Sequence, residues 1–285
     1  MEQPYKIISV ISVILISLIQ LFQSLSFIKY APKSDKWHSE AKDFIDGCKK
    51  VALRFDGDIF IVLYTISIVI CVSSFVLYIA FSKYIHKVNK HVKPATYILY
   101  FVEYVIFGCG FIPMISKFVE VQFCNNSSKI DSYTSVKCFK DEQLILLLVG
   151  YLGVGIAYIM NSVIFPTLKC ERNGVEKLWN NEAYMDGIYY LILISVVSLF
   201  GYLMLPWVGA LVCGAGLIYG LIFKSYERIE VACCKCAVLC SLMWAFACAD
   251  VLKDDADAGN DMLYAIPAAF AVGAALRYTR SFLVK

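Results

Sequence analysis

Long runs of apolar residues alternate with short polar segments along the whole chain. The runs have roughly the 20 residues that an α-helix needs to cross the hydrocarbon core of a bilayer. Eight spans are predicted, at about 7–27, 59–81, 97–118, 144–165, 188–204, 207–223, 231–249 and 262–278. The pattern therefore predicts an all-α fold, in which residues 1–285 form a single polytopic transmembrane helix-bundle domain.

Two features leave the number of spans open between seven and eight. The fifth and sixth runs meet at Pro206, and proline ends a helix because it lacks an N–H and has a fixed φ. This junction is compatible with a tight hairpin or with one long broken helix. The last run is short and rich in alanine, so it is also compatible with a tilted or half-buried helix.

Composition supports a membrane protein. Hydrophobic residues make up 60% of the chain and charged residues 17%, whereas soluble domains average about 45–50% and about 25%. The net charge is +3, with the basic residues scattered over many loops, so we expect a lipid bilayer and no nucleic acid as partner.

The basic loop at residues 83–93 predicts the orientation. It carries Lys83, Lys87, Lys90 and Lys93, and short loops rich in lysine stay on the cytoplasmic side. Both termini are then cytoplasmic, and the loops at 28–58, 119–143 and 250–261 lie outside. The acidic loop 250–261 is interpreted as a solvated segment, with a calcium site as the alternative.

The loop at 119–143 has features of an extracellular or lumenal segment. Cys124 and Cys138 are predicted to form a disulfide, and Asn125 and Asn126 begin overlapping glycosylation sequons. The alternative is a pair of reduced cysteines at the ends of neighbouring helices. The sequons predict passage through the secretory route, to the plasma membrane or another membrane of that route.

A second loop contains an amphipathic helix, predicted at 34–52. Its apolar positions recur at intervals of three and four, which is the spacing of one helix face; they are Trp37, Ala41, Phe44, Ile45, Cys48 and Ala52. Such a helix either lies on the membrane surface or caps the bundle, and a ligand-binding lid is the third interpretation.

Two charged residues, Glu103 and Lys235, fall inside apolar runs. A charge near the middle of a bilayer costs about 2.5–3.5 kcal/mol on insertion scales, so it needs a partner, water or a function. We expect the two to form an ion pair across the bundle; the alternative is that Lys235 extends to the interface. Gln20, Gln23 and Asn161 are predicted to form hydrogen bonds between helices.

Cysteines and glycines form two further patterns. Cys233, Cys234 and Cys236 are candidates for palmitoylation at the cytoplasmic end of a span, with burial as small apolar residues as the alternative. The CxxC spacing of Cys233 and Cys236 lacks the second pair of ligands that zinc needs, so no metal site is predicted. Gly216 and Gly220 have the GxxxG spacing of close helix packing, within one chain or between two.

The chain contains no GxSxG, HExxH or P-loop motif and no paired carboxylates within an apolar run. We therefore expect a protein that is not an enzyme and has no cofactor.

A series of short motifs resembles the multispanning region of the tiny macrocysts type of PAS-containing protist membrane proteins. They are the run Leu18–Phe27 with its two glutamines, Trp37, Phe111-Ile112-Pro113, Phe123-Cys124 and Cys138-Phe139. In that family a tryptophan usually follows the second loop cysteine and a histidine comes soon after, whereas this chain has Phe139 and no histidine there. The family's cytoplasmic PAS and downstream regions would follow the last span, where only residues 279–285 remain.

The resemblance implies sensory signalling, and the lack of those regions implies a partner chain. We therefore expect a receptor-like or sensory bundle that acts with a partner membrane protein or as a homo-oligomer. An ion channel or small-solute transporter is the second interpretation, because intramembrane charges often line a pathway. A non-catalytic structural subunit of a membrane complex is the third.

Overall fold

The computed structural model describes residues 3–30, 37–55, 57–85, 102–124, 129–130, 132–164, 181–203, 206–223, 228–251 and 257–283. The chain is mostly helical, as the apolar runs predict. In chain order the elements are α1 (Gln3–Leu25), the 3-10 helix η1 (Ser26–Tyr30), α2 (Ser39–Val51), α3 (Asp58–Ile85), the π-helix η3 (Val102–Cys109), α5 (Phe111–Glu120), β1 (Lys129–Ile130), β2 (Tyr133–Lys137), α6 (Asp141–Ile159), the π-helix η4 (Met160–Ile164), α8 (Asn181–Leu203), α9 (Pro206–Ile222), α10 (Ile229–Val251) and α11 (Ala258–Leu283).

Five helical segments of the described chain are long and apolar enough to cross a bilayer: Val10–Ile28, Asp58–Ala80, Asp141–Ile164, Ile229–Val251 and Gly259–Leu283. They coincide with five of the predicted spans. The fifth and sixth predicted spans correspond to shorter apolar helices, Tyr184–Ser198 and Pro206–Ile222. The third begins outside the described residues and continues as η3 and α5. By length and composition, the described residues thus contain five helices that could span a membrane, fewer than the predicted seven or eight.

The junction at Pro206 is a helical hairpin. The two helices contact each other in the middle of the pair, where a Cβ added at Gly216 would collide with Ile192, and at the end away from the junction, where the rings of Tyr184 and Tyr219 are 6.2 Å apart. One long broken helix would not bring these positions together. Of the two interpretations of this junction, the hairpin is the one that the structure shows.

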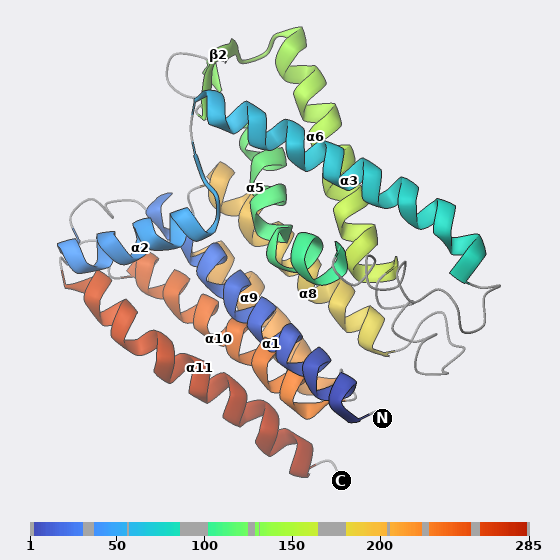
Figure 1. Cartoon of the computed structure of the whole chain (residues 1–285). Coiled ribbons are helices and arrows are strands. Elements are labelled where there is room, and N and C mark those ends of the chain that lie inside the picture. Colours follow the sequence, from blue (N-terminus) through green and yellow to red (C-terminus); the bar gives the residue numbers. More distant parts are fainter. Residues whose placement is uncertain are drawn as a thin grey trace.

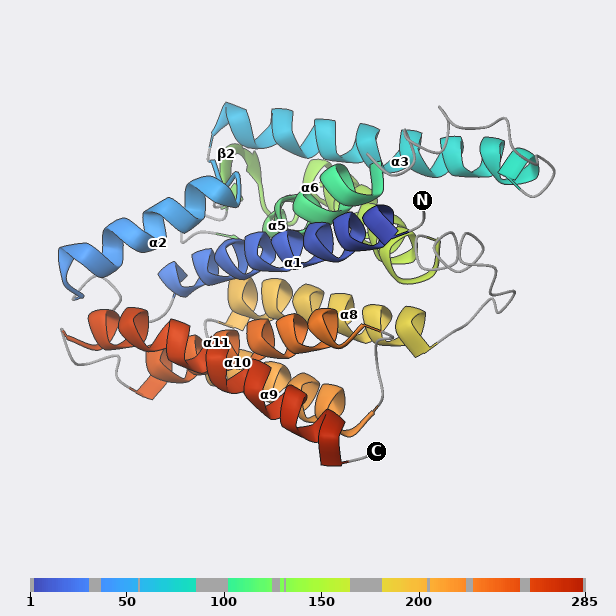
Figure 2. The same cartoon turned by 60° about the horizontal axis from the view of Figure 1, so that its bottom comes forward.

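Helix α10 is the centre of one side of the bundle. It packs between α9 and α11 and also against α1 (Figure 1). Within its apolar window 78% of the residues are buried, against 28% for α3 and 17% for α11. Figure 2 shows α3 and α11 on opposite sides, with α1 and α8 between them. The outer helices therefore have the apolar surface that lipid would cover.

Close helix packing depends on glycines of this chain. A Cβ at Gly273 in α11 would lie 2.8 Å from the Cα of Ala237 in α10, and one at Gly220 would lie 3.1 Å from the Sγ of Cys236. Gly216 faces Ile192 of α8. The GxxxG pair in α9 is therefore used for packing within the chain.

A small cap covers one end of the bundle. It consists of α2 and of the antiparallel hairpin β1–β2, in which Ile130 pairs with Tyr133. Helix α2 buries Ala41, Ile45 and Cys48 and contacts α1 and α11, so the face predicted from the spacing is the buried one. The hairpin is a small exception within the mostly helical fold: five residues of the loop, Tyr133–Lys137, form a strand that pairs with β1.

Candidate functional site

Lys235 of α10 lies in a buried polar site between helices. Its side chain is 8% exposed, and its ammonium group forms an ion pair with the carboxylate of Asp186 in α8. The Nζ atom also lies 4.6 Å from the ring centre of Tyr189 and 5.7 Å from that of Tyr190. A carboxylate and two aromatic faces thus surround the cation, which compensates much of its desolvation.

Lys235 has a partner that the sequence analysis did not identify, Asp186. The side chain of Glu103, the predicted partner, lies outside the described part of the chain, so that contact stays a prediction. The alternative in which Lys235 extends to the interface also stays a prediction, because the side chain is buried but its partner lies near the start of α8. Sequence reasoning missed Asp186 because the apolar run begins at residue 188, whereas α8 begins at Asn181 and carries the aspartate into the packed region.

Gln20 of α1 connects this site to η3. Its Nε2 donates to the carbonyl of Gly108 at 3.0 Å, and its Oε1 accepts from the Tyr189 hydroxyl at 3.3 Å. Gly108 lies in the last turn of η3, and carbonyls in the last turn of a helix have no partner within that helix, so Gln20 satisfies one of them. The predicted role of Gln20 in hydrogen bonding between helices is therefore confirmed.

Gln23 binds the next carbonyl of the same segment. Its Nε2 donates to the carbonyl of Cys109 at 2.8 Å and to that of Val51, at the end of α2, at 3.3 Å. One side chain thus joins α1, η3 and the cap helix. Asn161 behaves differently: in η4 it donates to the carbonyl of Ala157 in its own helix, at 3.0 Å. The two π-helices contact each other.

A second buried cluster lies at the cap end of α5. The Glu120 carboxylate accepts from Arg54 Nε at 2.9 Å and from Lys117 Nζ at 3.0 Å, and Ser132 Oγ lies 3.4 Å from it. All four side chains are buried, with Lys117 2% and Glu120 3% exposed. Buried charges need such partners, since an isolated one would be strongly destabilising.

Aromatic rings and a backbone carbonyl complete this cluster. Arg54 lies over the ring of Phe27 at 4.2 Å, and Lys117 over that of Phe60 at 4.7 Å. Lys117 also donates to the carbonyl of Phe55 at 3.2 Å. The cluster connects four parts of the chain: η1, helix α3, helix α5 and the segment that follows α2.

Sequence reasoning did not identify this cluster. Its charges stand at the borders of predicted spans, where charged residues usually face water. The available signal was the i, i+3 spacing of Lys117 and Glu120 after a long apolar run, which is compatible with an intrahelical pair.

One continuous segment connects the two buried polar sites. Glu120 is the last residue of α5, and at the other end of α5 the single residue Gly110 leads into η3, whose carbonyls are bound by Gln20 and Gln23. Through the hydrogen bond of Gln20 to Tyr189, this segment is also connected to the Lys235 site.

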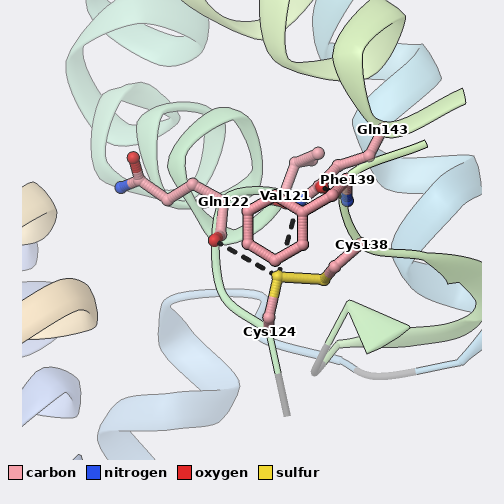
Figure 3. The surroundings of a disulfide bond; sticks show 6 residues. All are labelled: Val121, Gln122, Cys124, Cys138, Phe139 and Gln143. Atoms are coloured by element: carbon pink, nitrogen blue, oxygen red, sulfur yellow. Dashed lines mark hydrogen bonds between the residues drawn. A yellow bond between two sulfur atoms is a disulfide. The ribbon is translucent and has the colours of Figure 1, made fainter. Parts of the chain in front are cut away.

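The predicted disulfide pair lies at bonding distance. The sulfurs of Cys124 and Cys138 are 2.02 Å apart, and Gln143 Nε2 of α6 donates to the carbonyl of Val121 at 2.9 Å beside them (Figure 3). The sequon residues Asn125 and Asn126 lie outside the described residues.

Burial separates the thiols of the palmitoylation candidates. Cys234 and Cys236 are buried between helices, whereas Cys233 is half-buried. Acylation of the two buried cysteines would require their helices to separate. Among the described residues, no three metal-binding side chains of His, Cys, Asp or Glu come together.

Comparison of the chain with protein-family models, curated proteins and solved structures found no match.

Proposed function

We propose that the protein is a receptor-like or sensory membrane bundle, in which the cap at one end is coupled to the opposite half of the bundle through α5 and η3. The observation that carries the proposal is the direct connection of two buried polar sites by one segment, with Glu120 at its cap end and the bonded Gly108 and Cys109 carbonyls at its other end. These contacts support a role for α5 and η3 as a coupled element.

A π-helix provides the element that such coupling requires. Transmission between distant sites needs a segment with two discrete arrangements, and π-helical turns inside α-helices occur frequently at functional sites. Return of η3 to α-helical geometry would withdraw the Gly108 carbonyl from Gln20. Gln20 would then lose one of the two bonds that fix its side chain, and the change would reach its bond to Tyr189, whose ring lies beside Lys235.

The proposed orientation places the cap outside the cell or in a lumen, with the basic loop at 83–93 in the cytoplasm and eight passes in all. The disulfide pair and the sequons at Asn125 and Asn126 support this assignment, because disulfides form in oxidising compartments. A membrane of the secretory route, such as the plasma membrane, follows. Output through a partner membrane protein or a second copy of the chain belongs to the same proposal.

Hydrogen exchange in lipid nanodiscs tests the coupling. Glu120→Gln removes the charge that holds Arg54 and Lys117, and we expect faster amide exchange in residues 102–109 and 181–190 as well as in the cap. The matched control is Glu142→Gln, which changes an exposed glutamate at the same end of the bundle. Faster exchange confined to the cap would contradict the coupling.

A channel or transporter is the second candidate, supported by the intramembrane charges. In liposomes, ion or solute flux that Asp186→Asn or Glu103→Gln abolishes would favour transport and contradict the sensory proposal. A structural subunit is the third candidate, and it predicts partners in native mass spectra together with no coupling in the exchange experiment.

A further inference from the structure

Phe139 follows the disulfide cysteine and is exposed to an unusual degree for a large apolar residue. Its exposed fraction is 86%, higher than that of any other large hydrophobic side chain among the described residues. It also has a φ of 61°, a left-handed conformation that is rare and costly for a bulky side chain. An unfavourable backbone conformation and an exposed aromatic ring thus coincide at this residue.

The surrounding contacts hold Phe139 in this conformation. Its N–H donates to Oε1 of Gln143 at 2.7 Å, and the Nε2 of the same glutamine donates to the carbonyl of Val121. The disulfide to Cys124 fixes the preceding residue (Figure 3). Strained residues persist where the neighbouring structure determines them from several sides, and such positions gather at binding sites.

The ring lies just beyond the apolar outer surface of α6. Leu144, Ile145, Leu148 and Leu152 are each more than half exposed, as expected of a helix side that contacts lipid. Phe139 stands five positions before Leu144: the two steps up to Asp141 are outside the helix, and the last three are helical at about 1.5 Å each. An extended step covers up to about 3.3 Å, so the ring lies at most about 11 Å beyond Leu144 along the helix. The headgroup layer on each side of the hydrocarbon core is roughly 5–8 Å thick, so with Leu144 a few ångströms inside the core Phe139 lies at the level of the headgroups.

Charges beside the ring also fit an interfacial position. Lys137 and Lys140 flank it, and Asp141 and Glu142 follow in the first turn of α6, all four exposed. The two positive and two negative charges cancel. The turn is therefore suited to zwitterionic phospholipid headgroups and has no net attraction to anionic lipids. Tryptophan and tyrosine are enriched at this depth of membrane proteins, and lysine side chains extend to it; Phe139 offers the same apolar ring without their polar group.

We propose that the turn Lys137–Lys140 is an interfacial lipid anchor, in which Phe139 inserts among the phospholipid headgroups of the leaflet on the cap side. The anchor connects the disulfide loop to the membrane surface. Because Gln143 binds the carbonyl of Val121, the residue that follows α5, the end of α5 is connected to the same surface. This proposal is independent of the receptor-like function, because it follows from the exposure and backbone of one turn.

Site-specific ¹⁹F NMR in phosphatidylcholine nanodiscs tests the occupant. Trifluoromethyl-phenylalanine at position 139 should be broadened by lipids that carry a nitroxide on the headgroup and shielded from a water-soluble gadolinium chelate. The same label at Leu148 serves as the lipid-exposed control, and at Thr134, an exposed strand position, as the control for the cap surface. Broadening of the position 139 signal by gadolinium alone would overturn the proposal, and protection from both agents would indicate a second protein or a second copy in place of lipid.

A stability measurement separates anchoring from folding. Phe139→Gly relieves the left-handed strain, so the melting temperature in detergent should rise by roughly 2 °C, while amide exchange of the 137–143 segment in nanodiscs increases at least threefold. If Phe139→Gly lowers the melting temperature, the ring is a packing residue and the anchor is wrong. Phe139→Trp should retain the nanodisc protection, since tryptophan suits the same interface.

Discussion

Gln20 of α1 and Gly108 of η3 are 88 residues apart in the chain, yet the side-chain amide of one donates to the backbone carbonyl of the other at 3.0 Å. Both groups are buried, and the glutamine oxygen is bonded to Tyr189. A single side chain therefore satisfies the irregular backbone of η3 and links it to the helix that carries Asp186.

Loss of this amide should destabilise the bundle. Gln20→Leu keeps the volume but leaves the Gly108 carbonyl and the Tyr189 hydroxyl without their partner, at a cost of about 1–3 kcal/mol for each unsatisfied buried group. We expect a clear decrease of the thermal unfolding temperature in detergent. Phe22→Leu, at an exposed position of the same helix, is the control and should have little effect; equal effects would show that the amide is not important.

The pair of Lys235 and Asp186 should behave as a coupled unit. Breaking a buried ion pair by removing one partner typically costs 3–5 kcal/mol, because the other charge stays buried; solvation by nearby lipid headgroups or water would place the value lower. We expect Lys235→Gln and Asp186→Asn each to lower the free energy of unfolding, and the double variant to lose less than the sum of both.

A second double-mutant cycle tests Glu103, the partner of Lys235 that the sequence predicted. Glu103→Gln combined with Lys235→Gln is expected to be additive, since the ammonium already has Asp186 as its carboxylate. If the effects of Glu103→Gln and Lys235→Gln on the free energy of unfolding are strongly coupled, while those of Lys235→Gln and Asp186→Asn are additive, then Glu103 and not Asp186 is the partner of Lys235. Arg228→Gln, at the exposed start of the same helical region, controls for loss of a positive charge.

Lys235 illustrates which features of the structure could be predicted from the sequence and which could not. Hydropathy located the long helices, because lipid exposure requires apolar residues over a fixed length, and the three-and-four spacing located the buried face of α2. Hydropathy could not identify Asp186, which lies on the polar side of a predicted border, or the cluster of Arg54, Lys117 and Glu120. Their burial depends on contacts between segments distant in the chain, and no local pattern records such contacts.

The irregular elements escaped prediction for a related reason. A π-helix has the same apolar composition as an α-helix, so η3 and η4 resemble ordinary spans in the sequence. The glutamines of α1 were the available signal, because amides inside an apolar run need partners. Their partners became apparent only when the structure placed Gly108 and Cys109 beside them.

The disulfide should contribute measurably to the stability of the cap. Cys124 and Cys138 are 14 residues apart, and closing a loop of this length stabilises by about 3 kcal/mol in the chain-entropy model. The double variant Cys124→Ser/Cys138→Ser should unfold at a lower temperature, and the parent protein should lose the same amount on reduction. Unchanged melting on reduction, with intact bonding confirmed beforehand by mass spectrometry, would show that the cap is stabilised by its other contacts.

Cys48 reports whether the cap is closed. Its side chain lies on the buried face of α2, outside the membrane-spanning segments, and burial raises the pKa of its thiol to about 12, from an ordinary value of 9.0, against a smaller opposing effect of a backbone hydrogen bond. The reactive thiolate is therefore scarce at neutral pH. Because the folded pKa is the higher one, this thiol favours the folded cap below pH 9 and progressively less as the pH rises from 9 towards 12.

We expect alkylation of Cys48 at pH 7.5 to be slow in the parent protein and at least tenfold faster in Trp37→Ala. Trp37 is 2% exposed, and its side chain lies where a Cβ at Gly259 of α11 would approach within 3.0 Å, so truncating it removes packing between the cap and α11. Peptide mapping by mass spectrometry after a short pulse of N-ethylmaleimide measures the rate at this cysteine alone. Lys42→Ala changes an exposed position of the same helix and should leave the rate unchanged. Equally fast alkylation in the parent and both variants would mean that α2 leaves the bundle freely, and the cap could not then transmit a displacement to α5.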